Sequence, residues 1–293
     1  MRLPHLFLVV LITLLWGMNF VAVAHIVRDF PPILANALRF GVVLVLLLPY
    51  LRRVPGQMSI LLAIAFLMGV AHFGSMFLAM AIATDIAPIA IVAQVTVPLS
   101  TLLAVLVLGE RIGPWRISGL MLSFSGVLIF GLDPAGMSQT NAIALIVFSA
   151  LVYSIVAILM RRIKGAAPMT VQAWIAMAAV PGSLLLTLGL ESGQWAALSG
   201  ASWQSYGLIA YSALAASIIG HGGVYYLYQR YPVSTVSPFL LLAPVWAVLG
   251  AVVVMGEQLD WRDLLGGALT LAGVLIVTIR TRDPRLIETA EKI

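Results

Sequence analysis

Residues 119–129 read GLMLSFSGVLI, and residues 266–276 read GGALTLAGVLI, 147 positions later. The pair Gly109-Glu110 precedes the first stretch at the same spacing as Gly256-Glu257 precedes the second. Because these residues keep one register over such a distance, the second half of the chain is predicted to repeat the first. The predicted organisation is a first repeat over residues 1–135, a second repeat over residues 136–281 and a tail over residues 282–293.

The composition indicates that the chain lies in a membrane. Apolar residues make up 62% of it and charged residues 9%, whereas a soluble domain carries about 25% charged residues. A helix needs roughly 20 apolar residues to cross a bilayer, and long uninterrupted runs indicate helices rather than barrel strands. The sequence therefore predicts an all-α membrane protein with ten transmembrane helices. The predicted spans are 6–26, 33–51, 59–83, 87–108, 115–132, 141–160, 171–190, 206–229, 234–255 and 261–279.

The number of spans in each repeat predicts how the two repeats are related. Five is an odd number, so the second repeat enters the membrane from the opposite side to the first. The expected fold is therefore two inverted five-helix repeats. Inverted repeats are typical of secondary transporters that work by alternating access, with the solute site near the midplane between the halves.

The basic residues predict the orientation. If the N-terminus is inside, 13 of the 16 Lys and Arg residues fall on the cytoplasmic side, as the positive-inside rule requires. Only Arg28 and Arg262 fall outside, and Arg39 lies within the second span. The net charge of +5 is then a topology signal and does not indicate nucleic-acid binding. We expect a multi-pass protein of the cytoplasmic (inner) membrane with both termini in the cytoplasm.

The first span also has features of a cleaved signal peptide. Arg2, an apolar run and Ala22-Val-Ala24 imitate that design. The run is longer than a signal peptide needs, and it carries the polar group Trp16-Gly-Met-Asn19. We therefore favour a permanent span.

Enzyme chemistry finds little support in the sequence. There is no Cys, no HExxH motif, no phosphate-binding glycine loop and no pair of carboxylates inside the spans. No cofactor or metal ion is expected, and the expected partners are a small-molecule solute and the lipid bilayer. A membrane-embedded enzyme that uses His72 or His221 stays as the alternative of a different class. A receptor is disfavoured because the loops are short.

Several motifs resemble the EamA family of the drug/metabolite transporter superfamily. They are Trp16-Gly-Met-Asn19-Phe20, Pro31-Pro32 followed by Arg39-Phe40, and the Gly-Glu pairs at 109–110 and 256–257. Within the family the chain is similar to amino-acid and metabolite exporters of the O-acetylserine/cysteine type, at Gln94, Gly109-Glu110-Arg111 and Arg230-Tyr231. The resemblance covers about residues 5–280 and implies two five-helix repeats and efflux of small metabolites. It does not identify the solute.

Polar side chains inside the spans are candidates for the solute path, because they are costly in lipid. The strongest polar face is in the eighth span, where Ser217, His221 and Tyr225 recur at i, i+4 and i+8. Asn19 and Arg39 lie at a similar depth in the first two spans, so they are expected to meet. The candidate cavity residues are Trp16, Asn19, Asn36, Arg39, His72, Gln94, Tyr153, Gln172, Trp174, Ser217, His221, Tyr225 and Ser237.

Three of these candidates have two open interpretations each. His72 and His221 both begin a His-x-Gly sequence in the third and eighth spans. They line the solute path in one interpretation, and each donates to a helix carbonyl in the other. Arg39 either receives the carboxylate of a solute or has a structural role, in which it bonds Asn19, a free carbonyl or a loop acid such as Asp85. For Arg39 we favour the structural role.

Prolines and small residues predict the helix geometry. Pro98 in the fourth span, with Pro238 and Pro244 in the ninth, is expected to kink its helix and to act as a hinge. Small residues on one face of the fifth and tenth spans indicate close helix packing. This packing lies within one chain, which we favour, or between two chains, so the protein is a monomer or a homodimer.

The expected function is export of amino acids or related small metabolites across the cytoplasmic membrane. A proton-driven carrier needs a membrane-embedded group that titrates, and the acidic residues all fall in loops, tails or span ends. Facilitated diffusion is therefore favoured, and a proton-coupled drug/metabolite antiporter that uses His72 and His221 is the alternative.

Overall fold

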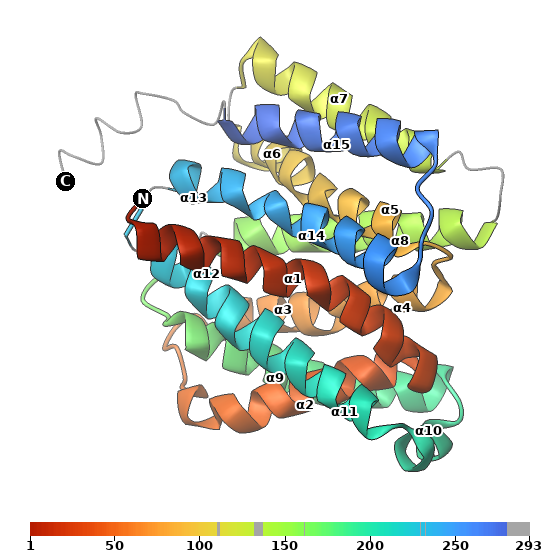
Figure 1. The fold of residues 1–293 in the computed structure, drawn as a ribbon. Helices are drawn as coiled ribbons and strands as arrows, with labels where there is room; N and C mark the ends of the chain where they lie inside the picture. The colour runs from red at the N-terminus through yellow and green to blue at the C-terminus, as the bar shows by residue number, and fades with distance from the viewer. Residues whose placement is uncertain (110–111, 132–136, 161, 229, 232, 280–293) are drawn as a thin grey trace.

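The computed structural model describes residues 1–279 except 110–111, 132–136, 161, 229 and 232, and every regular element in this part is helical (Figure 1). The first half contains α1 Leu3–Asp29, α2 Pro32–Leu47, η1 Leu48–Tyr50, α3 Met58–Phe66, η2 Leu67–His72, α4 Phe73–Ile82, α5 Ile86–Val92, η3 Ala93–Val95, α6 Thr96–Leu108 and α7 Pro114–Gly131. The second half contains α8 Met137–Met160, α9 Pro168–Leu190, α10 Gln194–Gly200, α11 Trp203–Tyr211, η4 Ser212–Gly220, α12 His221–Tyr228, α13 Val233–Leu240, α14 Leu242–Gly250, η5 Ala251–Met255 and α15 Trp261–Ile279.

Nine runs of helix in the described residues are long and apolar enough to cross a membrane. They coincide with nine of the ten predicted spans. The remaining predicted span, 115–132, overlaps α7, a helix of 18 residues that is not among the nine. Its first turn carries the charged Arg116, which lowers the hydropathy of a helix that is already short. The all-helical membrane fold is thus present, with α7 as its least apolar long helix.

Several of the long runs change helical geometry part-way along. The runs Met58–Ile82 and Trp203–Val224 contain the π-helical segments η2 and η4, which the sequence did not predict. Pro98 lies in the first turn of α6, directly after the 3-10 segment η3, and Pro244 lies in the first turn of α14. Because α6 continues from η3 within one helical run, the missing N–H of Pro98 removes a bond to the preceding turn, and the change to 3-10 geometry at that turn fits this loss. Pro238 lies inside α13.

Carboxylates from distant loops cap two of the helices. Glu191, which follows α9, accepts the backbone N–H groups of Ile33 at 2.8 Å and Leu34 at 3.1 Å at the start of α2. Glu257, which follows η5, accepts those of Ile86 at 2.7 Å and Ala87 at 3.0 Å at the start of α5. Neither helix has a capping side chain at its own N-cap residue. The first N–H groups of a helix need acceptors, and here the other half of the chain supplies them.

Helices α7 and α15 pack side by side at one edge of the molecule (Figure 1). A Cβ atom on Gly119 would lie 2.9 Å from the carbonyl oxygen of Gly273, and one on Gly126 would lie 2.5 Å from that of Gly266. Only glycine permits this approach. The small residues of these two helices therefore serve packing within one chain, the alternative that the sequence favoured.

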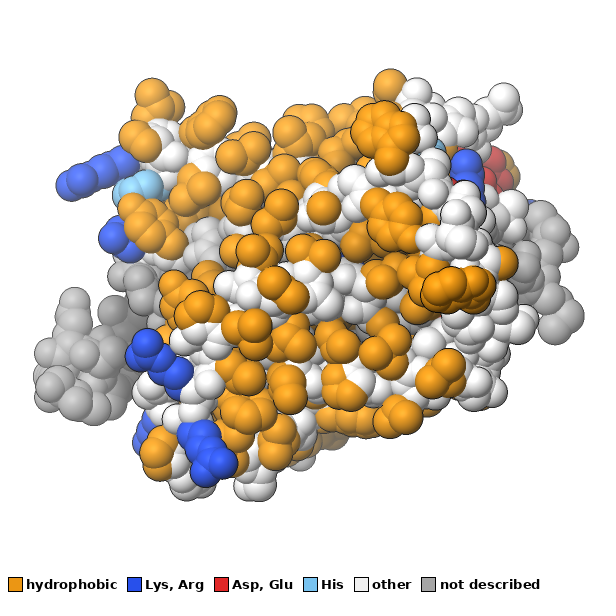
Figure 2. Space-filling model, turned by 90° about the horizontal axis from the view of Figure 1, so that it is seen from below, with side chains coloured by type: hydrophobic (Ala, Val, Ile, Leu, Met, Phe, Trp, Pro, Cys, Tyr) orange, Lys and Arg blue, Asp and Glu red, His pale blue; other side chains and the backbone are white. Residues whose placement is uncertain are grey.

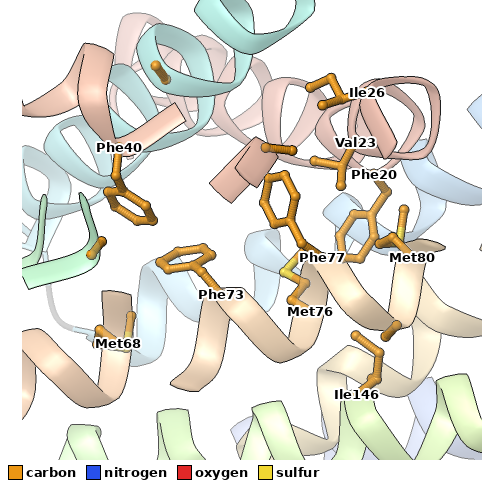
Figure 3. Close-up of a cluster of buried hydrophobic side chains, with 14 of the residues drawn as sticks. Phe20, Val23, Ile26, Phe40, Met68, Phe73, Met76, Phe77, Met80 and Ile146 are labelled. Atoms are coloured by element: carbon orange, nitrogen blue, oxygen red, sulfur yellow. The ribbon is translucent and has the colours of Figure 1, made fainter. Parts of the chain in front are cut away.

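A core of aromatic and Met side chains fills the space between α1, α2, α4 and α8 (Figure 3). Phe40 and Phe77 are fully buried in it, and Phe20 and Phe73 are nearly so. In lipid such packing replaces the hydrophobic effect as the force between helices. This core fixes the position of α2, the helix that carries Asn36 and Arg39.

The outer surface is apolar along the helices and charged at the ends. Figure 2 shows one flank covered with hydrophobic side chains, with most of its Lys and Arg side chains at the end where the N-terminus lies. Trp195 lies in the short helix α10, which follows α9, and Trp203 is the first residue of α11. Both side chains are exposed. Aromatic side chains are typical of the membrane–water boundary, so this surface fits a protein that spans a bilayer.

Candidate functional site

A polar cluster surrounds the π-helical segment η4. The wide turns of a π-helix leave carbonyl groups open to side chains from other helices, and such turns are frequent at functional sites. Trp16 of α1 donates its Nε1 to the carbonyl oxygen of Ala216 at 3.0 Å, and Gln172 of α9 donates its Nε2 to that of Ser217 at 3.5 Å. We call six residues the η4 cluster: Trp16, Arg39, Gln172, Ser212, Ser217 and His221.

Arg39 of α2 is the charged member of the η4 cluster and is only 2% exposed. Its Nη2 donates to Ser217 Oγ at 2.9 Å, and its Nε donates to the same oxygen at 3.3 Å. Its guanidinium carbon lies 4.6 Å from the centre of the Phe73 ring and 5.4 Å from that of Phe40. A desolvated cation over an aromatic face gains about 2 kcal/mol. Within the described residues, the charge of Arg39 is therefore met by aromatic rings and one neutral hydroxyl.

Three atoms of the η4 cluster are buried without a hydrogen-bond partner among the described residues. They are Arg39 Nη1, Ser212 Oγ and His221 Nδ1. An unsatisfied buried polar group costs about 1–3 kcal/mol, so several of them in one cluster need an explanation. A small polar molecule bound at η4 would supply the missing partners.

Asn36, one turn before Arg39 on α2, is fully buried and joins three helical elements. Its Nδ2 donates to the carbonyl oxygen of Gly69 in η2 at 2.9 Å and to Ser183 Oγ in α9 at 2.9 Å. Asn36 belongs to the first half of the chain, and Ser183 lies in the last third of α9, whose end carries the capping Glu191. The contact therefore joins the two halves at the same end of α2.

His72, at the end of η2, faces α8. Its Nδ1 lies 3.0 Å from the carbonyl oxygen of Ser149 and 2.8 Å from Ser149 Oγ. Since a carbonyl oxygen only accepts, His72 carries a proton on Nδ1 in this contact. The ring also contacts that of Tyr153, with centroids 5.2 Å apart. His72 thus makes the carbonyl contact that one of its two interpretations expected. His221 Nδ1 makes no hydrogen bond of normal geometry in the described part, although its ring interacts with the backbone of Ala216 and contacts the Trp16 ring, with centroids 5.3 Å apart.

Other predicted candidates lie outside the η4 cluster. The expected pairing of Asn19 with Arg39 is not formed, because the Arg39 side chain reaches Ser217 on η4 instead. Asn19 and the half-buried Gln94 make no side-chain hydrogen bond within the described residues. Trp174 lies near one end of α9 and donates its Nε1 to the carbonyl oxygen of Arg52, away from η4.

Some predictions fall on parts of the chain that the structure does not describe. The side chains of Tyr225 and Ser237 lie outside the described part, although their backbones belong to α12 and α13. The same holds for Glu110 and Arg111 of the Gly-Glu-Arg motif and for the tail at residues 282–293.

Three serines of the site were missed from the sequence. Ser149 meets His72, Ser183 meets Asn36, and Ser212 belongs to η4. Serine is common in membrane helices and carries no signal by itself.

Two surface grooves are apolar, and their lining does not include the η4 cluster. One is lined by residues of α2 and α9, among them Gly41 and Val45, and the other by residues that include Leu14 and Leu208. Both lie on flanks that lipid would cover. Among the described residues, no three His, Cys, Asp or Glu side chains come together as a metal site.

Comparisons with known proteins agree on one class. The profile of the EamA-like transporter family matches residues 3–132 and again residues 140–279. A "probable amino-acid metabolite efflux pump" of Salmonella typhimurium is 26% identical over 279 residues, covering 92% of this chain and 93% of that protein. A protein of the same description from Escherichia coli is 24% identical over 277 residues, with 92% and 93% covered.

Two further comparisons concern an archaeal relative and the fold. An "uncharacterized transporter" of Archaeoglobus fulgidus is 25% identical over 277 residues, covering 89% of this chain and 94% of that protein. A crystal structure matches with a TM-score of 0.66 at 19% identity, covering 98% of this chain and 99% of that chain. At this identity the structural likeness supports the fold alone.

Proposed function

Because the chain belongs to the EamA-like transporter family, we propose that it exports amino acids or related small metabolites across the cytoplasmic membrane by alternating access. It is a transporter and not an enzyme. The observation that carries the proposal is the η4 cluster, in which Trp16 and Arg39 come from the first half of the chain and the other four members from the second. A buried polar site between two halves is where inverted-repeat transporters bind their solute.

We propose further that residues 1–135 and 136–281 form two inverted five-helix repeats, with α7 as the tenth span. The glycine contacts between α7 and α15 support this arrangement. Gly119 meets Gly273 and Gly126 meets Gly266. The 147-residue offset converts one pair into the other, because Gly119 corresponds to Gly266 and Gly126 to Gly273. Such reciprocity is expected of two like elements related by a two-fold axis.

The proposed orientation puts both termini in the cytoplasm, in line with the positive-inside rule. Lys164→Cys is expected to react only with reagents on the cytoplasmic side and Gly200→Cys only with reagents outside. Both residues are exposed, and Lys164 holds Gln57 through its backbone, which the substitution keeps. The measurement is labelling of intact cells with an impermeant maleimide before and after permeabilisation. Labelling of both positions from the same side would contradict the odd number of spans between them.

Solute exchange in proteoliposomes tests the function itself. Counterflow of radiolabelled amino acids should depend on the purified protein and on an unlabelled amino acid trapped inside. Vesicles prepared without the protein serve as the control for leakage. If no amino acid and no small metabolite exchanges above that control, the transport proposal is wrong.

The same vesicles test the energy source, which we propose to be the gradient of the solute. The acidic residues of the described part, which are Asp29, Asp85, Glu191, Glu257, Asp260 and Asp263, all lie at the ends of spans. If one proton exchanged per solute, a gradient of one pH unit would drive roughly tenfold accumulation, and we expect none. Accumulation that disappears in a double variant, His72→Ala with His221→Ala, would instead establish the proton-coupled alternative.

A further inference from the structure

We propose that Arg39 binds the carboxylate group of the transported solute. When the site is empty, the Ser217 hydroxyl accepts hydrogen bonds from both Nε and Nη2 of Arg39. The proposal rests on the proposed transport function and specifies its substrate class. The solutes would be amino acids or other small carboxylates, and the corresponding amines and alcohols would be rejected.

The first argument is the unbalanced charge. Arg39 is 2% exposed and lies in the middle of α2, Pro32–Leu47. A buried cation is costly unless an anion or several acceptors compensate it. Within the described residues its only hydrogen-bond acceptor is Ser217 Oγ, supported by the faces of Phe73 and Phe40. The site therefore holds a positive charge that an anionic solute would neutralise.

The second argument is the geometry of the guanidinium group. A carboxylate binds arginine through two oxygens at once, each accepting from a separate N–H of the planar fork. Both Nε and Nη2 of Arg39 donate to one hydroxyl oxygen, Ser217 Oγ, and Nη1 has no partner in the described part of the chain. A carboxylate on the Nη1–Nη2 edge would fill the empty position and exchange a neutral acceptor for a charged one. Ser217 would keep its bond to Nε.

The third argument is that the remaining groups of η4 suit the rest of an amino acid. Ser212 Oγ and His221 Nδ1 have no partner among the described residues, and they lie before and after Ser217 along the same run of helix. Oxygen and imidazole nitrogen atoms accept hydrogen bonds from an ammonium group. The side chain of Ser217 itself reaches back to the carbonyl oxygen of Ser212 at 3.5 Å. Because Ser212 and His221 are nine positions apart along this run, on the order of 10 Å, a small zwitterion bound to Arg39 would direct its ammonium group to one of the two atoms.

The alternative is the structural role that the sequence favoured, and the Arg39→Met variant separates the two. Methionine keeps the length and apolar stem of the side chain without its charge. Replacement of a poorly compensated buried charge by an apolar group is often neutral or stabilising. The carboxylate anchor therefore predicts a folded protein with an unchanged or higher melting temperature. A structural arginine predicts a lower melting temperature and equal loss of binding for every ligand.

The experiment compares three pairs of ligands that differ only in the carboxylate: alanine with alaninol, leucine with leucinol, and phenylalanine with phenylalaninol. Binding to the detergent-purified protein is read from tryptophan fluorescence and from the ligand-induced shift in melting temperature. In at least one pair the amino acid should bind the wild-type protein about tenfold or more tightly than its alcohol, as loss of a charged hydrogen bond implies. Arg39→Met should remove this preference, and Arg39→Lys should restore only part of it.

Matched variants control the interpretation. Arg230→Gln removes an exposed arginine that stacks on the Tyr226 ring at 3.7 Å, outside the η4 cluster, and should leave the preference unchanged. Ser217→Ala frees the Arg39 fork and should keep the preference for the carboxylate. Amino alcohols that bind as tightly as amino acids, no binding by either member of every pair, or an Arg39→Met protein that keeps the preference would overturn the proposal. If one of these results is obtained and uncharged metabolites still show counterflow, the proposed transport function is retained and only the role of Arg39 is rejected.

Discussion

A leucine in place of Gly273 is expected to prevent α7 and α15 from packing and to leave almost no folded protein. A Cβ atom at position 273 would lie 2.6 Å from the carbonyl oxygen of Gly119 and 2.8 Å from the Cα atom of Ser123. These are backbone atoms, which cannot move aside without separating the two helices. Overpacking of a side chain costs roughly 1–3 kcal/mol, and a clash with backbone should exceed that range.

The measurement is the yield of monodisperse protein in detergent, followed by its melting curve. Gly207→Leu is the matched control, because Gly207 is exposed on α11 and a Cβ atom there would meet no neighbouring atom within 4 Å. It should fold as the wild-type protein does. Gly126→Leu should be as damaging as Gly273→Leu, because Gly126 makes the reciprocal contact with Gly266. A Gly273→Leu protein with normal yield and melting temperature would show that α7 and α15 are not packed as described.

Removal of the Glu191 carboxylate is expected to produce the second largest loss of stability. Glu191 accepts hydrogen bonds from the N–H groups of Ile33 and Leu34 and from Thr187 Oγ1, the last at 2.5 Å. In the Glu191→Ala protein two N–H groups at the start of α2 lose their acceptor, and the helix dipole loses its counter-charge. Hydrogen bonds to charged groups contribute about 1.5–3 kcal/mol each, and water can replace part of the acceptor because Glu191 is half-buried. We therefore expect a net loss of roughly 2–4 kcal/mol.

Chemical denaturation of the detergent-purified protein measures this loss. Glu191→Gln should recover part of it, because an amide oxygen still accepts one of the two N–H groups. Ser199→Ala is the neutral control, since the exposed Ser199 bonds only to carbonyl groups of its own helix. If Glu191→Ala is as stable as Ser199→Ala, the start of α2 does not depend on the loop after α9. Solute affinity should fall together with stability, because α2 carries Asn36 and Arg39.

Local sequence patterns predicted the parts of this fold that depend on local physics. Hydropathy located the helical runs, because the bilayer sets both their length and their composition. The spacing of Gly119 and Gly126 predicted a close helix contact, because only small residues allow it. The sequence also identified Arg39 as a charge in the membrane. It could not supply the partner of Arg39, which depends on how α2 packs against η4.

The remaining features depend on contacts between distant segments or on small changes of helix geometry. The π-helical segments η2 and η4 have the same apolar composition as an α-helix, so periodicity does not reveal them. The capping role of Glu191 and Glu257 requires the loops after α9 and η5 to meet the starts of α2 and α5. Trp174 was expected in the cavity because it lies in a span, but its Nε1 reaches the Arg52 carbonyl near the membrane boundary.

The glycine contacts between α7 and α15 have a consequence for the covalent architecture under the proposed inverted repeat. If two separate copies of one five-helix unit formed the same assembly, one mutation at either glycine of the unit would introduce a side chain at both contacts. In a single polypeptide the same mutation changes only one contact, either that of Gly119 with Gly273 or that of Gly126 with Gly266. Fusion of the halves thus allows each of the two contacts to be altered by itself.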